Sequence, residues 1–237
     1  MKIINQEKFL TYNIIEYDIV DSTMIVAKNF SENTIIIAQQ QEKARGKGDR
    51  VWNAENNNNL YFSLNLKANK EILDYSQLSF VSSVAMRQAI KEYDKNNNSI
   101  VSKWPNDILI NGKKTCGILL EFDFSTKMLC IGIGVNVSFY PENTMFRATS
   151  LKKEEIIVDK YSLLKSFLNN FTFLLKEWES YGFTPIRAKW LENCYKLHQE
   201  IEVNKQKGIF EDIDKDGTLI MTLQNKKKYF VKSGDVF

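Results

Sequence analysis

The sequence is poor in the residues on which histidine, zinc and disulfide chemistry depend. It contains one histidine, His198, and three cysteines, Cys116, Cys130 and Cys194, in 237 residues. The cysteines form no CxxC pair and their number is odd, which argues against a disulfide scaffold and against a zinc knuckle. A single histidine among lysines and glutamates argues against a histidine-based triad and against a histidine metal site.

The sequence also lacks long apolar runs and a strong excess of one charge. No run approaches the length that crosses a membrane, and residues 1–20 have no signal-peptide core. The net charge of +3 arises from 32 basic and 29 acidic residues, which is too little to hold DNA, RNA or a membrane surface. We therefore expect a cytoplasmic protein without a membrane partner. Any binding of anions by its basic residues must come from a local cluster and not from the overall charge.

The length and the order of apolar patterns predict two domains. A chain of 237 residues that is 43% hydrophobic can bury a sizeable core. Apolar residues recur at helical spacing over 76–93 and 159–181, whereas short strand patterns and turns dominate after 196. We expect a main domain over residues 1–195 and a small β-barrel domain over residues 196–237.

A glycine-rich basic loop, residues 38–52, follows a β-branched strand pattern at 34–38. Gly46 and Gly48 would let backbone amides approach a phosphate closely. The cations that supply charge-assisted donors are Lys43, Arg45, Lys47 and Arg50. A solvated surface loop is the alternative. We interpret the stretch as an anion-binding loop because a second polar stretch accompanies it.

That second stretch, residues 101–122, contains a hairpin signal. Asn111 and Gly112 form the Asn-Gly pair typical of a tight β-turn. The turn folds Lys114 back beside the strand that carries Asp107, so Asn106, Asp107 and Lys114 should converge. The sequence thus predicts a cluster of one lysine, one carboxylate and one amide.

A third glycine pair lies in a strand pattern at residues 128–137. Gly132 and Gly134 precede Asn136, and glycines within a strand usually mark close approach of a ligand or another part of the chain. The GIGVN stretch lacks the third glycine and the following helix of a dinucleotide fingerprint, which excludes a Rossmann site.

Several residues keep two interpretations from the sequence alone. Ser22 and Thr23 stand where a helix begins at about residue 22 and extends to residue 30, and capping is the more frequent role there. Trp52 is as often a core anchor as a stacking platform. Asp107 fits a Mg²⁺ ligand or an exposed turn. The asparagines at 56–59 indicate a turn without chemistry.

These polar groups suit charge stabilisation better than covalent catalysis. No serine or cysteine has a histidine base, and no pair of acids is recognisable. A carboxylate that attacks the α-phosphate of ATP brings two anions together, and fixed cations relieve their repulsion. Activation of a carboxylic acid by ATP is therefore the chemistry that the residues support.

With these motifs, the sequence resembles the biotin protein ligases over nearly its whole length. The signatures occur in the family's order: DST at 21–23, a glutamine at 41 before the basic loop at 44–52, KWPNDI at 103–108, GILLE at 117–121 preceded by a lysine at 114, GxGxN at 132–136, and DG and SGDV near the C-terminus.

The resemblance implies both a fold and an activity. The fold would be α+β, a mixed sheet with flanking helices related to the class II aminoacyl-tRNA synthetases, plus a small C-terminal β-barrel. The enzyme would use biotin and ATP as substrates, with Mg²⁺, to make biotinyl-5′-AMP. It would then transfer biotin to a lysine of a biotin carboxyl carrier domain of acetyl-CoA carboxylase or a related carboxylase. Whether the chain forms a homodimer stays open.

The same resemblance assigns roles to individual residues. The biotin-binding set would be Ser22, Thr23, Met24, Gln41, Arg45, Gly46, Lys47, Lys114 and Gly117. The ATP-binding set would be Arg45, Lys47, Arg50, Trp52, Lys103, Asn106, Asp107 and Asn136. The catalytic residues would be Arg45, Lys114 and Asp107, and Asp107 would also be the Mg²⁺ ligand.

The chain departs from the family pattern at Met24, Ala44, Lys47 and Asp49. Lysine keeps the charge of the usual arginine and loses its planar fork, so we expect the adenylate to escape faster. The DST motif begins at residue 21, which leaves no room for a helix-turn-helix domain, and we expect no DNA binding. The alternatives are a lipoate protein ligase, a binding module whose barrel engages a peptide or RNA, and a degenerate, inactive ligase.

Overall fold

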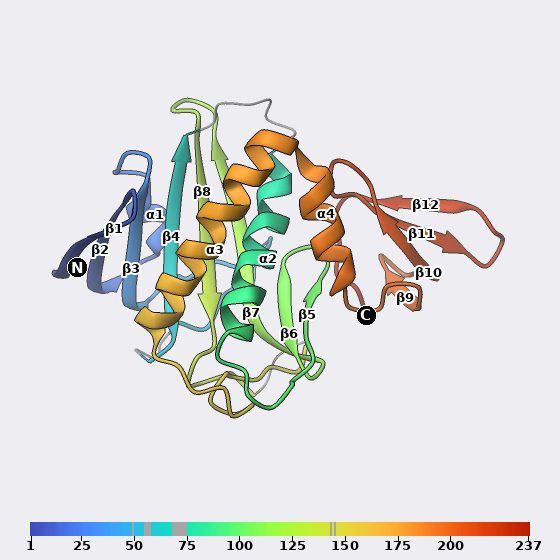
Figure 1. The fold of residues 1–237 in the computed structure, drawn as a ribbon, viewed down its shortest axis with the longest axis horizontal. Coiled ribbons are helices and arrows are strands. Elements are labelled where there is room, and N and C mark those ends of the chain that lie inside the picture. Colours follow the sequence, from blue (N-terminus) through green and yellow to red (C-terminus); the bar gives the residue numbers. More distant parts are fainter. Residues whose placement is uncertain (49, 55–57, 68–74, 143, 145) are drawn as a thin grey trace.

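The computed structural model describes residues 1–48, 50–54, 58–67, 75–142, 144 and 146–237 (Figure 1). Asp49, one of the departures noted above, and the first two asparagines of the 56–59 turn lie outside the described residues. Within the described part no helix is both long enough and apolar enough to cross a membrane.

Eight of the described strands form one mixed sheet. Strands β2 and β3 are parallel, and the other neighbouring pairs are antiparallel. In spatial order the strands are β1 (Ile3–Phe9), β2 (Tyr12–Val20), β3 (Thr34–Gln41), β4 (Leu60–Lys67), β8 (Met128–Val135), β7 (Lys113–Asp123), β6 (Asp107–Ile110) and β5 (Ile100–Lys103). This confirms the predicted mixed sheet.

Three helices, α2 (Gln77–Lys91), α3 (Lys160–Tyr181) and α4 (Phe183–Glu192), lie together in front of the sheet in Figure 1. Helix α3 begins where Asp159 accepts hydrogen bonds from the backbone N–H groups of Tyr161 and Ser162, each 3.0 Å long. It ends at Gly182, whose φ of 73° suits glycine. The helices predicted over 76–93 and 159–181 are thus confirmed, with ends that differ by at most two residues.

Alternation along the strands separates a large core from a smaller one on the opposite face. Ile14 of β2 belongs to the large core with α2 and α3, whereas Ile15 packs in the smaller core with α1 (Thr23–Ala27). In β8, Ile131 and Ile133 fill the large core. Gly132 and Gly134 therefore present a surface without side chains on the α1 face.

The C-terminal strands form a second, four-stranded antiparallel sheet, as expected for a small β unit. The strands are β9 (Glu200–Val203), β10 (Gln206–Ile213), β11 (Leu219–Leu223) and β12 (Lys228–Val231), in the order β12-β11-β10-β9. Phe210 and Val231 belong to the same apolar core as α2 and α3, and Trp104 Nε1 donates to Gly217 O at 2.9 Å. The two-domain division at residues 195 and 196 stays a prediction.

Three local features differ from the sequence predictions. The edge strand β1 was not predicted, because its residues are almost all exposed and show no alternation. Ser22 takes the N-cap position of α1 without a side-chain capping bond, and the helix ends at Ala27. Asn59 is buried, and its Oδ1 accepts hydrogen bonds from the backbone N–H groups of residues 137–139 at 2.9 to 3.1 Å. It is therefore a structural anchor.

Candidate active site

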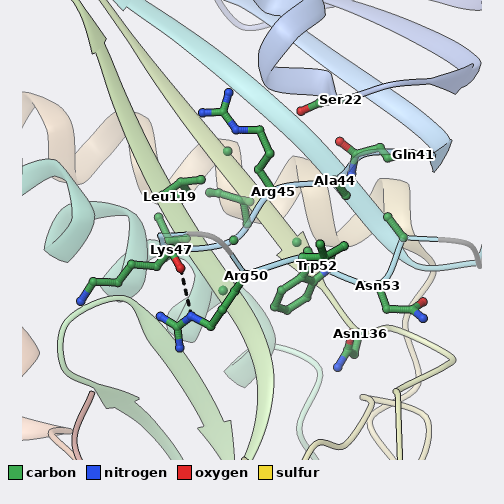
Figure 2. A pocket seen from close by; sticks show the side chains of 18 of the residues that line it. Ser22, Gln41, Ala44, Arg45, Lys47, Arg50, Trp52, Asn53, Leu119 and Asn136 are labelled. Atoms are coloured by element: carbon green, nitrogen blue, oxygen red, sulfur yellow. Dashed lines mark hydrogen bonds between the residues drawn. The ribbon is translucent and has the colours of Figure 1, made fainter. Parts of the chain in front are cut away.

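The basic loop is a folded hairpin-like turn that starts at the end of β3. Gly46 N donates to Arg50 O at 2.8 Å, and Trp52 N donates to Ala44 O at 3.1 Å. A Cβ at Gly46 would lie 3.1 Å from Arg50 O, so the close crossing of the chain favours glycine there. Figure 2 shows Arg50 Nε donating to Lys47 O, a bond of 3.0 Å.

The indole of Trp52 lies against glycines of the sheet. A Cβ at Gly134 would be 2.6 Å from Trp52 Nε1, and a Cβ at Gly117 would be 2.8 Å from Trp52 Cζ3. These two glycines are register partners on β8 and β7. The predicted close approach at the strand glycines is therefore confirmed, and the approaching group is the Trp52 ring.

A different side chain, that of Met24, lies against the neighbouring glycine on β8. A Cβ at Gly132 would lie 2.6 Å from Met24 Sδ. Since Gly132 pairs with Leu119 and Gly134 pairs with Gly117, Met24 and Trp52 follow one another along β7 and β8. The glycine-lined face of the sheet thus forms the floor of the site.

The predicted lysine and carboxylate converge. Lys114 Nζ lies 2.6 Å from Asp107 Oδ1 and 5.4 Å from the centroid of the Trp52 ring. The turn at Asn111 and Gly112, with φ angles of 51° and 75°, returns the chain as predicted. Asn106 Nδ2 is hydrogen-bonded to Ile118 O, so this amide also holds β6 against β7.

A group of hydroxyl and amide side chains lies beside Met24. Gln41 Oε1 accepts a hydrogen bond of 2.8 Å from Thr23 N and one of 3.1 Å from Thr23 Oγ1. Thr23 Oγ1 is also 2.7 Å from the buried Ser63 Oγ of β4. This arrangement orients the side chains of the predicted biotin-binding residues Thr23 and Gln41.

The loop cations Lys47 and Arg50 contact the C-terminal segment. Lys47 Nζ donates to Gly234 O at 2.8 Å, and Arg50 NH1 lies 3.1 and 3.2 Å from the two carboxylate oxygens of Asp235. Burial lowers the pKa of Lys47. The C-terminal segment thus holds the loop through two of its cations.

Lys103 is buried behind two aromatic rings. Its Nζ lies 3.3 Å from the centroid of Phe146 and 5.9 Å from that of Phe237, and these rings stack at 4.9 Å. Burial lowers the pKa of Lys103 to about 8. This lysine therefore titrates within the range in which an enzyme is readily assayed.

These side chains surround a cavity of about 560 Å³ (Figure 2). Its lining includes every predicted site residue except Lys103: Ser22, Thr23, Met24, Gln41, Arg45, Gly46, Lys47, Arg50, Trp52, Asn106, Asp107, Lys114, Gly117 and Asn136. The structure therefore brings the predicted residues together, while their individual roles toward a ligand stay predictions.

Two predicted donors are engaged elsewhere in the described structure. Lys43, expected among the phosphate donors, pairs with Asp21 at 2.7 Å and does not line the cavity. Asn136 is buried, and its Nδ2 donates to Thr149 O at 3.0 Å. One of the two N–H groups of this Nδ2 is thereby used within the protein.

Sequence reasoning missed Ser63 and Phe146, and it gave no role to Asp235 of the SGDV motif. Each of these residues acts through a contact with a residue distant in sequence, and no local pattern reveals that contact. Two further atoms on the wall are ready to bind a ligand: Trp52 Nε1 and Asn53 Oδ1 are buried and have no hydrogen-bond partner among the described residues. Such atoms gain from a polar ligand that pairs with them.

The cavity thus combines a glycine floor, a polar pocket beside Met24, and cations around Lys114 and the loop. This is the site of a protein that binds an organic acid and a phosphate compound side by side. The sequence model of the Biotin/lipoate A/B protein ligase family matches residues 17–138, and the chain belongs to this family. The resemblance found from the motifs is confirmed.

Individual relatives agree with this membership. The chain is 32% identical to the bifunctional ligase/repressor BirA of Bacillus subtilis over 92% of this chain and 72% of that protein. It is 30% identical to the biotin–[acetyl-CoA-carboxylase] ligase of Paracoccus denitrificans, over 83% and 87% of the two chains. The biotin protein ligase of Aquifex aeolicus in complex with biotin and ATP superposes with a TM-score of 0.82 and 27% identity, over 94% and 97% of the chains.

Proposed function

We propose that this chain is an ATP-dependent ligase that activates biotin as biotinyl-5′-AMP. It then transfers biotin to a lysine of a carrier domain of acetyl-CoA carboxylase or a related carboxylase. The observation that carries the proposal is the convergence of Thr23, Trp52 and Lys114 on one glycine-floored cavity. The Paracoccus relative is a biotin–[acetyl-CoA-carboxylase] ligase and the Aquifex structure contains biotin and ATP, which supports the proposal.

In the first step, a carboxylate oxygen of biotin attacks the α-phosphorus of ATP. A new P–O bond forms, the bond to the oxygen that bridges to the β-phosphate breaks, and pyrophosphate leaves with the electron pair. Because both reactants are anions, the fixed cations of the cavity, with Lys114 at its floor, lower the repulsion between them.

In the second step, the amine of the acceptor lysine attacks the acyl carbon of the adenylate. The amide bond forms, the bond from the acyl carbon to the phosphate oxygen breaks, and AMP leaves while the amine loses a proton. Asp107 already holds the ammonium group of Lys114 at 2.6 Å. That contact supports Asp107 as the group that orients a second ammonium or amine at the same place.

A Mg²⁺ ion fits this site as a companion of ATP and not as a resident metal. Within the described residues, no group of three or more histidine, cysteine, aspartate or glutamate side chains could hold a metal ion. Asp107 is a single carboxylate and is paired with Lys114. Mg²⁺ that is held mainly by nucleotide phosphates needs at most one such carboxylate.

The polar pocket distinguishes biotin from lipoate. Thr23, Gln41 and Ser63 form a hydrogen-bonded group beside Met24, and an uncharged ureido ring can bond with such groups. A dithiolane ring offers neither donors nor strong acceptors, so it would form no comparable hydrogen bonds with this group. Sites that hydrogen-bond their ligand reject analogues that lack those groups.

Calorimetric titration of the purified protein with biotin, and separately with lipoate, tests the proposal. We expect biotin to bind, and to bind more tightly in the presence of MgATP. Binding of lipoate alone would assign the chain to the lipoate branch of the family. The absence of binding with both acids would favour an inactive binding module.

The partner and the location follow from the same proposal. The acceptor is a biotin carboxyl carrier domain, the chain acts in the cytoplasm, and it does not bind DNA. A homodimer is an additional hypothesis, which sedimentation with and without biotin and MgATP tests. Incubation with a purified carrier domain tests the acceptor, with a gain in mass by one biotin as the expected result.

A further inference from the structure

We propose that Glu121 is a positioning residue that fixes Arg45 as the end wall of the biotin pocket. The inference rests on the proposed function and extends it, because Glu121 does not line the cavity itself. The resemblance to the ligases left Glu121 without a role. The structure connects this carboxylate of the sheet to the first cation of the loop.

The contact between the two side chains is direct. The guanidinium NH2 of Arg45 pairs with Glu121 Oε1, and Lys28 Nζ lies 3.7 Å from Glu121 Oε2. Glu121 belongs to β7, so its backbone is held in the ladder with β8. A rigid strand thus supplies the carboxylate, and the loop supplies the arginine.

Arg45 points in a different direction from the other loop cations. In Figure 2 its side chain extends away from Lys47 and Arg50. Lys47 and Arg50 contact the C-terminal Gly234 and Asp235. The loop is therefore held at two separate anchors, and Glu121 is the anchor on the sheet side.

The order of residues along β7 and β8 locates this anchor. Trp52 lies over the pair of Gly117 and Gly134, and Met24 lies over Gly132, two residues further along β8. Glu121 pairs with Cys130, which is two residues further again. Arg45 therefore reaches beyond Met24, at the end of the cavity opposite Lys114.

This geometry assigns a physical effect to Glu121. A free arginine samples many rotamers, and ordering it when the ligand binds costs conformational entropy. The paired Arg45 is already ordered, and so is the start of the loop from which it projects. Glu121 thereby preorganises the pocket for the acid, while the nucleotide side is held by the other anchor.

The test is the affinity for biotin, measured by calorimetry without nucleotide. In the Glu121→Gln variant, which keeps the size of the side chain, we expect the Kd to rise roughly tenfold, as for one lost charge-assisted bond. The matched control is Lys28→Gln, which removes the other partner of Glu121 and leaves Arg45 paired. We expect the Kd of this control to stay within about twofold of wild type.

A double-mutant cycle separates positioning from a general structural effect. In an Arg45→Ala background, the change of Glu121 to Gln should cause no further loss, because its partner is already gone. Glu121→Asp keeps the charge, and we expect it to retain part of the affinity. Thermal unfolding of each variant reports whether the fold is intact. The Arg45→Gln variant removes the charge of the same ion pair from the loop side.

The outcomes distinguish this inference from the proposed function. If the wild-type protein does not bind biotin, the proposed function is wrong. If the wild-type protein binds biotin and Glu121→Gln binds equally well, the positioning role is wrong. An equal loss in the wild-type and Arg45→Ala backgrounds would also overturn it, because Glu121 would then act without Arg45.

Discussion

Lys114 Nζ lies 2.6 Å from Asp107 Oδ1, with the Trp52 ring 5.4 Å from the same nitrogen. The lysine stands on β7 and the aspartate begins β6, so the tight turn between these strands creates the contact. The pair fixes a positive charge beside the indole. In the proposed reaction this is the position at which the carboxylate of biotin meets the α-phosphate.

The Lys114→Ala variant should lose adenylate formation. Removal of one fixed donor at a developing charge typically costs roughly a hundredfold or more in rate, and we expect at least that loss in biotin-dependent pyrophosphate release. Lys113→Ala is the matched control, because Lys113 is adjacent in sequence and pairs with Glu154 at 2.8 Å. Wild-type adenylation in Lys114→Ala would contradict the assignment.

The Lys47→Arg variant should retain the adenylate longer. Lys47 donates a hydrogen bond to Gly234 O at 2.8 Å through its ammonium group, whereas a guanidinium can donate two parallel bonds to a phosphate. We expect the adenylate to dissociate several-fold more slowly from the variant, measured by rapid dilution of the preformed complex. An unchanged dissociation rate would mean that the loop lysine does not limit retention.

The Gly134→Ala variant should weaken nucleotide binding. The new Cβ would lie 2.6 Å from Trp52 Nε1, so the indole must move off the sheet. If Trp52 supports the adenine, we expect the Kd for ATP to rise roughly tenfold or more, within the range measured for stacking of a base on an aromatic ring. Calorimetric titration with MgATP measures it.

Gly132→Ala is the matched control for that variant. It places the same methyl group on the same strand and face, 2.6 Å from Met24 Sδ. A flexible methionine can yield more easily than an indole, and the change falls on the biotin side. We expect a small loss of biotin affinity with little effect on ATP affinity. A larger loss of ATP affinity than of biotin affinity would contradict the placement of the two ligands.

The affinity for MgATP should fall as the pH rises through about 8. Burial lowers the pKa of Lys103 to about 8, so the side chain is a cation below that pH and neutral above it. Lys103 does not line the cavity, so its charge would act on the phosphates from behind the wall, and the cationic form gives tighter binding on the acid side. Titrations at several pH values measure the effect, and Lys103→Arg, which stays charged, should show a much weaker pH dependence. An identical profile in the two proteins would contradict the role of Lys103.

Local sequence patterns predicted much of the fold and the composition of the cavity. The Asn111 and Gly112 turn predicted the contact between Lys114 and Asp107, because two-residue turns fix the register of a hairpin. The strand glycines predicted a close approach, since an L side chain would block it. The family motifs then identified fourteen of the cavity-lining residues by position.

Long-range contacts could not be predicted in the same way. The partner of Arg45 is on β7 and the partner of Arg50 is near the C-terminus, so the loop sequence alone does not reveal where its cations point. The hydrogen bond between Thr23 and Ser63 joins α1 to β4. The edge strand β1 has no buried face, so it lacks the alternation by which strands are recognised.

The most direct test of carboxylate activation at this site is mass spectrometry of a single-turnover mixture of the protein, biotin and MgATP. We expect biotinyl-5′-AMP and one equivalent of pyrophosphate, and neither product when biotin is omitted or when Lys114→Ala replaces the wild-type protein. Binding of biotin and ATP without any adenylate or pyrophosphate would contradict the proposed activity and identify the chain as an inactive member of its family.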